Sequence, residues 1–269
     1  MNQHFAQRIA AAYSQHADTY ASVLEPSLAP MAAEIARRAN LSSGRLALDI
    51  ATGTGLVARA LAHAAASVVG VDISLGILRA ASGRSQGQIP FVAGDAHRLP
   101  FRARTFDLVT CAISLTHFSD VQTALREVHR LLRPGGRFIT SAWATEGENP
   151  TKAAAVRVRQ RFLPEREITF GGSFGNELWA DVARGRAALR RAGFAKIQVA
   201  TLPLSGAYSN HKEALEAALA WPVTRYRIAQ LSPTQQRKLR EETAAAIRRV
   251  SDLRWRSDLH YYQATRPGD

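Results

Sequence analysis

Residues 45–56 read RLALDIATGTGL, and this stretch decides the fold. An apolar run ends in an acid, Asp49, small residues follow at once, and a helical pattern then begins. A strand that breaks into a glycine-rich turn at the start of a helix lets a ligand approach bare backbone N–H groups. Doubly wound α/β proteins hold adenosine-containing ligands in this way. The sequence therefore predicts such a site at Asp49 and the turn that follows it.

Bulk composition is that of an ordinary globular protein. Of 269 residues, 46% are hydrophobic and 21% are charged. The one cysteine, Cys111, excludes an internal disulfide and a zinc site built on several thiolates, and it favours a reducing compartment. Residues 1–16 lack the build of a secretion signal, and no apolar run reaches the roughly 18–20 residues of a membrane span. We therefore expect a cytoplasmic protein with no metal site and no membrane span.

The net charge of +13 is distributed unevenly along the chain. Residues 151–269 hold 21 Lys and Arg against 11 Asp and Glu, a net +10, whereas residues 1–150 hold 14 against 11, a net +3. A solvated, arginine-rich surface is the plain interpretation. The alternative is an anionic small molecule as partner, and nucleic acid is less expected than either.

The order of the predicted elements indicates one α/β domain with a Rossmann-like, doubly wound and mostly parallel sheet of seven strands. Strands are predicted at 46–50, 67–73, 88–94, 105–113, 137–143, 195–202 and 254–266, the last as a closing edge strand. Helices are predicted at 2–16, 28–39, 55–65, 74–82, 120–132, 150–162 and 177–192 and within 210–250, with Pro134-Gly135-Gly136 ending the fifth of them. The expected layout is an N-terminal helical cap (1–44), a cofactor-binding core (45–145), the rest of the core (146–208), a helical lid inserted before the last strand (209–252) and the closing strand (253–269).

Two interpretations compete for the glycine turn. Residues 53–58 fit the dinucleotide pattern G-x-G-x-x-A, and Asp72 follows at a distance that suits a ribose hydroxyl, which would also fit an NAD(P)-dependent oxidoreductase. However, Asp49 would repel a pyrophosphate and would attract an ammonium or sulfonium group. Asp95 and Ala96 close the third strand and can offer a carboxylate and an N–H to the edge of an adenine. These features favour a cationic nucleoside.

Five segments in this order resemble the class I S-adenosylmethionine-dependent methyltransferases, in the branch of ubiquinone/menaquinone and small-molecule methyltransferases. They are DIATGTG (49–55), VVGVDIS (68–74), GDAHRLPF (94–101), FDLVTC (106–111) and LREVHRLLRPGGRF (125–138). The resemblance covers residues 10–145, and Ala51 stands where this family more often has glycine.

The resemblance implies a role for each matching residue. Asp49 and the turn residues Ala51, Thr52, Gly53 and Gly55 would hold the methionine part of S-adenosylmethionine. Asp72 would bind the ribose hydroxyls, Ile73 would pack on the adenine, and Asp95 and Ala96 would bind its edge. Cys111 would line the pocket through its backbone more than its thiol, and Tyr13 and Tyr20 would fold over the cofactor. The alternatives are cap or turn roles for Asp72 and Asp95, core packing for Cys111, and ordinary helix packing for the two tyrosines.

The expected reaction is in-line methyl transfer to a small-molecule acceptor, which is quinone-like, a natural product or an anionic metabolite. Such displacement needs alignment and exclusion of water, and a general base helps where the acceptor is a hydroxyl. The candidate bases are His117 and Glu146, with His16 and Tyr13 in reach, whereas His97 is expected on a surface loop. An anionic acceptor would draw on the basic residues Arg157, Arg159, Arg161, Arg225 and Arg227. A protein of this fold that catalyses a cyclisation is a further alternative, and the sequence leaves a homodimer open.

Overall fold

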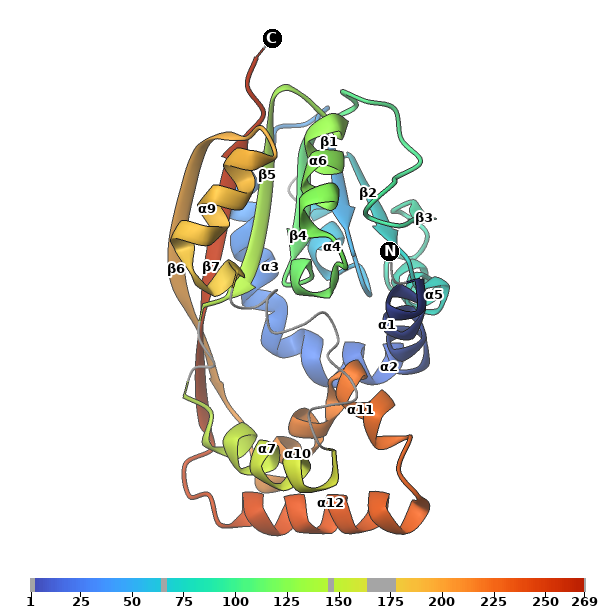
Figure 1. Ribbon diagram of the computed structural model, residues 1–269, viewed down its shortest axis with the longest axis vertical. Helices are drawn as coiled ribbons and strands as arrows, with labels where there is room; N and C mark the ends of the chain where they lie inside the picture. Colours follow the sequence, from blue (N-terminus) through green and yellow to red (C-terminus); the bar gives the residue numbers. More distant parts are fainter. Residues whose placement is uncertain (1–2, 64–66, 145–147, 164–177, 269) are drawn as a thin grey trace.

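The computed structural model describes residues 3–63, 67–144, 148–163 and 178–268 and shows one seven-stranded sheet flanked by helices (Figure 1). The strands are β1 (Leu46–Ile50), β2 (Ser67–Asp72), β3 (Phe91–Ala93), β4 (Phe106–Ala112), β5 (Leu132–Trp143), β6 (Ala195–Ala207) and β7 (Arg254–Thr265). Their order in the sheet is β3-β2-β1-β4-β5-β7-β6. Strands β1 to β5 are parallel, and β7 is antiparallel to both β5 and β6. The predicted mostly parallel, doubly wound sheet is confirmed.

The strand order reverses between β1 and β4, which pair at the middle of the sheet. From β1 the chain continues outward to β2 and β3, and from β4 it continues outward to β5 on the other side. Open α/β sheets bind ligands outside the carboxyl ends of their strands at such a reversal. The glycine turn follows β1 directly, so the topology places it at this point.

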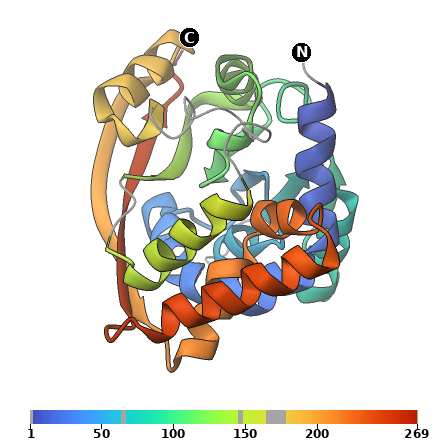
Figure 2. The same ribbon diagram turned by 60° about the horizontal axis from the view of Figure 1, so that its bottom comes forward.

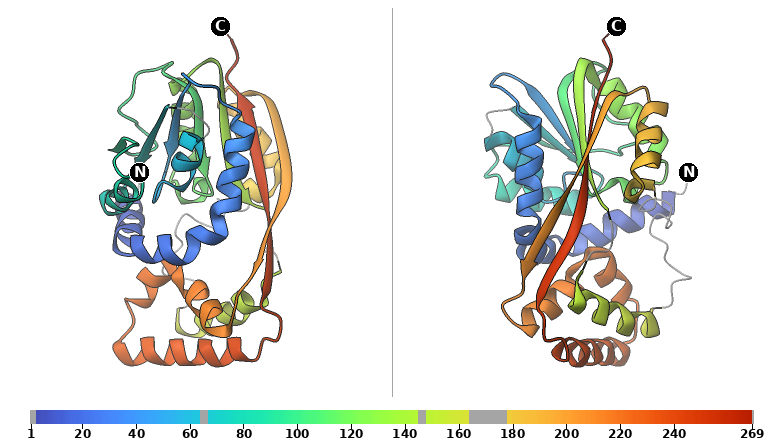
Figure 3. Two further views of the ribbon diagram at one scale, coloured as in Figure 1. Left: turned by 180° about the vertical axis from the view of Figure 1, so that it is seen from behind. Right: turned by 90° about the vertical axis from the view of Figure 1, so that its left-hand side faces the viewer.

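Helices cover both faces of the sheet. They are α1 (Gln3–Gln15), α2 (Ala17–Thr19), the π-helix η1 (Tyr20–Leu24), α3 (Glu25–Ala39), α4 (Leu56–His63), α5 (Leu75–Arg84), the 3-10 helix η2 (Leu115–His117), α6 (Val121–Leu131), α7 (Pro150–Phe162), α9 (Val182–Arg191), α10 (His211–Ala220), α11 (Pro222–Ile228) and α12 (Pro233–Arg248). On one face, Ile35 of α3 and Leu61 of α4 pack against the strands, and on the other Leu125 of α6 and Leu189 of α9 do so (Figure 3). Burial of these apolar faces holds the layers together.

Helix α6 ends one residue earlier than predicted, because the next strand begins before the Pro-Gly-Gly segment. Strand β5 starts at Leu132, which pairs with Phe106, whereas the next register pair joins Leu108 to Arg137. Residues 133–136 therefore form a bulge within the strand. Pro134-Gly135-Gly136 shapes this bulge and does not itself terminate the helix.

The prediction that residues 254–266 form an edge strand is wrong. Strand β7 lies between β5 and β6, and β6 is the edge. Strand β6 also continues beyond the predicted end to Ala207, through Pro203, and it pairs with β7 along this extension. An edge strand tolerates proline because one side of its backbone needs no partner.

Of the predicted N-terminal cap, α3 packs on a face of the sheet, whereas the helices before it lie beyond the carboxyl edge of the sheet together with the predicted lid, and the two groups of helices touch each other. Helix α1 contacts α11, and η1 contacts α10. Helix α7 joins the lid, since Ala155 packs into an apolar cluster with Leu215, Leu239 and Ile247 (Figure 2). Figure 1 shows α12 as the outermost helix on this side. Within the described part of the chain, no helix combines the length and apolar character that crossing a membrane demands.

Candidate active site

The glycine turn between β1 and α4 borders a cavity of about 1060 Å³. The backbone reaches positive φ at Ala51 (51°), Gly53 (58°) and Gly55 (82°). Glycine adopts this left-handed region freely, whereas alanine is strained there. A Cβ on Gly53 would approach only Ile77 Cδ1, at 3.8 Å. Gly53 therefore presents bare backbone to the cavity, as the sequence predicted for this turn.

Asp49 lines the same cavity although it is only 2% exposed. Its Oδ1 accepts a hydrogen bond from Thr110 Oγ1 and its Oδ2 accepts one from Thr52 Oγ1, both at 2.7 Å. Burial raises the pKa of this carboxyl to about 6, and the two hydroxyls offset the effect only in part. The backbone of Ala58 also hydrogen-bonds this carboxyl, and a carboxylate with about four lone-pair sites still keeps acceptor capacity for a ligand. Thr110 is a site residue that sequence reasoning missed, because it reads as an ordinary strand residue.

Asp72 and Ile73 form the neighbouring wall of the cavity. Asp72 Oδ1 accepts from Ser74 N at 2.9 Å and Oδ2 accepts from Gly53 N at 3.0 Å, so this carboxylate braces the glycine turn. Burial raises the pKa of Asp72. Ile73 is 39% exposed and is thus open to contact with a ligand in the cavity. Helix α5 is capped by Ser74 and not by Asp72.

Among the residues that the structure describes, neither Asp49 nor Asp72 has a cationic partner. Within the described residues, no lysine, arginine or histidine forms an ion pair with Asp49 or Asp72. Buried carboxylates are normally paired, since taking a lone charge out of water is costly. The two carboxylates therefore fit a ligand that brings a positive charge near Asp49 and hydroxyl donors near Asp72.

Asp95 and Ala96 lie at the end of β3 and line the cavity, as does His97. Asp95 Oδ1 accepts from His97 N at 2.9 Å and lies 2.5 Å from His97 Nδ1. The backbone N–H of Asp120, at the start of α6, donates to His97 Nε2. His97 lies in the loop after β3, as expected, but its side chain is only 9% exposed, because it contacts Asp95 and accepts from the N–H of Asp120.

Tyr13 and Tyr20 reach the cavity from the cap, with their ring centroids 5.9 Å apart. The helical path is broken after Gln15 and continues through the π-helix η1, which contains Tyr20. Single π-turns of this kind often occur at functional sites. Burial raises the pKa of both phenols, so both stay protonated. Ser14 Oγ lies 2.7 Å from Ser74 Oγ and fastens α1 to the start of α5.

His117 contacts Tyr13 across the cavity. Its Nε2 lies 3.2 Å from the Tyr13 hydroxyl, and its Nδ1 is buried without a hydrogen-bond partner among the described residues. Burial lowers the pKa of His117 to about 4, so the imidazole is neutral at pH 7. His16 is absent from the described lining of the cavity. The tyrosine–histidine pair is the titratable contact best placed to handle a proton.

Three predicted site residues are not placed in the cavity. Cys111 is absent from the described lining of the cavity, and its side chain is fully buried in the core on the α6 side. Gly55 also lies outside the described lining: it turns the chain, and a Cβ there would press on Phe91 at 3.0 Å. Glu146 lies outside the residues that the structure describes.

Of the five candidate arginines, the described lining of the cavity contains Arg159. Arg157 and Arg161 border a separate groove between α7 and α12, where Arg161 pairs with Glu242. Arg225 and Arg227 lie on α11, and Arg227 donates to the carbonyl of Leu163. In the residues described, no three His, Cys, Asp or Glu side chains come together as a metal cluster.

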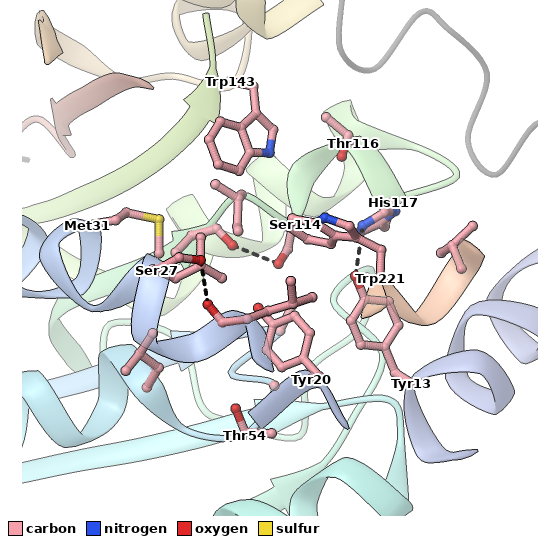
Figure 4. A pocket seen from close by; sticks show the side chains of 18 of the residues that line it. Tyr13, Tyr20, Ser27, Met31, Thr54, Ser114, Thr116, His117, Trp143 and Trp221 are labelled. Atoms are coloured by element: carbon pink, nitrogen blue, oxygen red, sulfur yellow. Dashed lines mark hydrogen bonds between the residues drawn. The ribbon is translucent and has the colours of Figure 1, made fainter. Parts of the chain in front are cut away.

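An aromatic wall lines the part of the cavity that faces the lid (Figure 4). Trp221, at the junction of α10 and α11, lies edge-on to Tyr20 and to Trp143 of β5, with centroid distances of 6.3 and 6.5 Å. Together with the contacts of Tyr13, these rings form one chain from His117 to Trp143. Sequence reasoning missed both tryptophans, because segments remote in sequence bring them together.

Comparison with known proteins gives three results. The family model described as "Methyltransferase domain" matches residues 48–140. The demethylmenaquinone methyltransferase of Streptomyces griseus is 32% identical over 160 residues, which is 56% of this chain and 68% of that protein. Phosphoethanolamine N-methyltransferase 2 of Haemonchus contortus, solved in complex with S-adenosyl-L-methionine, matches with a TM-score of 0.54 at 19% identity, over 88% of this chain and 52% of that one.

The [4+2]-cyclase SpnF also has this fold, with a TM-score of 0.57 at 21% identity over 90% of this chain and 82% of the cyclase. The chain spans about half the length of most of the curated relatives that it matches.

Proposed function

The chain belongs to the class I S-adenosylmethionine-dependent methyltransferases, in their quinone and small-molecule branch, and from this we propose that it methylates a small-molecule acceptor. The observation that carries the proposal is the pair of carboxylates beside the glycine turn, Asp49 and Asp72, which line the cavity and have no cationic partner among the described residues. A dinucleotide pyrophosphate would add negative charge beside them, whereas a sulfonium nucleoside with an ammonium group would supply the missing positive charge.

The described residues fit S-adenosylmethionine at the carboxyl edge of the sheet. Asp49 would hold the ammonium end together with the turn of Ala51, Thr52 and Gly53. Asp72 would accept the ribose hydroxyls, Ile73 would cover one face of the adenine, and Asp95 and Ala96 would meet its edge. When bound, S-adenosylmethionine supplies a methyl group that is already activated by its sulfonium.

The chain itself would then align the acceptor with the methyl group, exclude water from the cavity and accept or relay one proton. The cap and the lid contact each other and both border the cavity, so their closure over a bound ligand would exclude water. We assign proton handling to His117 and Tyr13, whose hydrogen bond spans 3.2 Å. A neutral imidazole can accept a proton at Nε2, with the Tyr13 hydroxyl as the bridge to the acceptor. A histidine with a pKa of about 4 is a weak base, so it suits an acceptor that is itself acidic, such as a phenol or enol.

The walls facing the lid favour an acceptor with a flat, apolar body. Trp143 and Trp221 offer ring faces and edges for packing. Lys152 and Arg159 of α7 also border the cavity, so an anionic group at the far end of the acceptor would find basic partners. Turnover of charged and neutral analogues at several salt concentrations tests this, and equal salt dependence for both would remove the anionic group from the proposal. The single buried cysteine suits a reducing compartment such as the cytoplasm.

The decisive experiment is calorimetric titration of the purified protein with S-adenosylhomocysteine, S-adenosylmethionine and NADH. We expect both sulfur nucleosides to bind and NADH to give no heat. Tight NADH binding without a response to either nucleoside would refute the proposal and restore the oxidoreductase alternative.

Product mass separates methyl transfer from cyclisation. With S-adenosylmethionine and an acceptor pool, a methylated product gains about 14 daltons, whereas a cyclised product keeps the mass of its substrate. Transfer of a deuterated methyl group to the product is the expected result. A product of unchanged mass would assign the chain to the chemistry for which the cyclase SpnF is named.

A further inference from the structure

Glu25 is a buried carboxylate that neither the sequence motifs nor the proposed chemistry uses. It is the first residue of α3 and is 6% exposed. Thr54 Oγ1, in the glycine turn, donates to its Oε1, and Arg59 of α4 donates to its Oε2 at 3.1 Å. Arg84, at the end of α5, lies 3.5 Å from the same Oε2. Three elements around the cofactor turn therefore converge on one cap residue.

Arg59 closes a ring of hydrogen bonds. Besides Glu25, it donates to the carbonyl of Thr54 at 2.5 Å. Thr54 is consequently held at its hydroxyl by Glu25 and at its backbone by Arg59. Thr54 is 1% exposed and lines the cavity between Gly53 and Gly55, so the ring restrains the part of the turn that a ligand must contact (Figure 4).

The other end of the connection is the cap. Glu25 follows directly on η1, whose Tyr20 lines the same cavity, and no break in the helix separates the two. The backbone N–H of Glu25 donates to the carbonyl of Tyr20, so a restraint on Glu25 acts directly on the helical segment that carries Tyr20. Glu34, on the same helix, serves as a contrast: within the described part of the chain, its ion pairs join it to Arg37 and Arg38, one turn away.

We propose that Glu25 is a positioning residue that couples docking of the cap to the conformation of the glycine turn, so that cofactor binding and cap closure favour each other. The inference rests on the proposed function, since the ligand of the turn is taken to be S-adenosylmethionine. Such coupling is reciprocal. A ligand at the turn must therefore favour docking of the cap by the same free energy by which a docked cap favours binding of the ligand.

The test measures amide hydrogen exchange in α1 and η1, with and without S-adenosylhomocysteine, together with the dissociation constant of that nucleoside. The variants are Glu25→Gln and Thr54→Val, each of which breaks the ring, with Thr54→Ser, which keeps the hydroxyl, and Glu34→Gln as matched controls. For each ring-breaking variant we expect about tenfold weaker binding and loss of the ligand-induced protection of the cap. Thr54→Ser and Glu34→Gln should keep wild-type affinity within about twofold.

The double variant Glu25→Gln/Thr54→Val distinguishes coupling from simple loss of stability. If both residues act through one ring, the double variant binds no more weakly than the weaker single variant. Additive losses, or full ligand-induced protection in Glu25→Gln, would overturn the inference. If the wild-type protein did not bind the nucleoside, the proposed function would be refuted instead. Amide hydrogen exchange of the cap in the ligand-free variants would still show whether the ring of hydrogen bonds holds the cap in place.

Discussion

At the scale of single residues, Asp49 is under conflicting demands. Its carboxyl has a pKa of about 6 in the folded chain against an ordinary 3.8, because burial penalises the charge. Between these two values the folded state binds more protons than the unfolded state, so stability is lost as the pH rises through this window. At neutral pH the free protein therefore carries an unpaired buried charge that a cationic ligand would neutralise.

The substitution Asp49→Asn should separate stability from binding. Removing the buried charge is expected to raise the stability of the free protein at pH 7.5 by about 1–2 kcal/mol, whereas affinity for S-adenosylhomocysteine should fall at least about tenfold. Thermal unfolding and calorimetry measure the two effects. Asp107 is the control, because its bonds to Leu46 N, Arg45 and Arg133 lower its pKa, and Asp107→Asn should destabilise. A less stable Asp49→Asn protein at pH 7.5 would contradict this account.

The same carboxyl predicts how binding depends on pH. Protonation of Asp49 removes the charge that attracts the ammonium group, so affinity for S-adenosylhomocysteine should be constant above about pH 7 and should decline as the pH falls through about 6. Titrations from pH 8 to pH 5 test this, with the Asp49→Asn protein as the reference. Equal pH dependence in both proteins would assign the effect to another group.

Ala51 stands where the resembled family more often has glycine, and its backbone conformation is strained for alanine. A φ of 51° is strained for alanine by about 1–2 kcal/mol, of which the greater freedom of unfolded glycine cancels a part. We expect Ala51→Gly to stabilise the protein by up to about 1 kcal/mol without weakening nucleoside binding. Gly53→Ala, at a φ of 58°, should destabilise the protein and weaken nucleoside binding. Denaturant unfolding and calorimetry decide between these outcomes.

At the scale of elements, the sequence predicts the helices and strands that local residue patterns determine. It does not predict the features that depend on pairing between strands far apart in the chain. The alternation of strands and helices from residue 46 to residue 131 follows from apolar periodicity and turn residues, and the structure confirms it. The place of β7 between β5 and β6 depends on pairing between segments far apart in the chain, which no local pattern encodes. Strand pairing also determines the bulge at residues 133–136, which arises where β5 pairs with β4. In the same way, β6 continues through Pro203 because it pairs with β7 there.

Trp221 connects the lid to the cap, so its loss should act on the acceptor and not on the cofactor. It packs edge-on against Tyr20 and Trp143 in the cavity wall and makes no ring contact with the acidic residues of the glycine turn. Trp221→Ala removes that packing surface, and we expect the KM of the acceptor to rise about tenfold while the Kd of S-adenosylhomocysteine stays within about twofold. Steady-state kinetics and calorimetry measure the two. A parallel loss of nucleoside affinity would show that the lid serves the cofactor as well.

At the scale of the whole molecule, the two ends of the cavity differ in how far sequence reasoning could reach. The cofactor end is built from the ends of β1, β2 and β3, and topology alone brings those ends together. The acceptor end draws on α3, β5, α7 and the junction of α10 and α11, so its residues meet only through tertiary packing. The candidate arginines show the difference, because the described cavity lining holds Arg159 but none of the other four.

Because cap, sheet and lid all border one cavity, a ligand there should stabilise the molecule as a unit. At a free concentration one hundred times its Kd, S-adenosylhomocysteine adds about 2.7 kcal/mol. For a chain of this size, that shifts the unfolding midpoint by roughly 5–10 °C. The shift should appear in one cooperative transition in scanning calorimetry, and NADH at the same concentration should cause none. If the lid and cap melted separately from the sheet, only the later transition would move with the ligand, and the cavity would not be the element that unites the three parts.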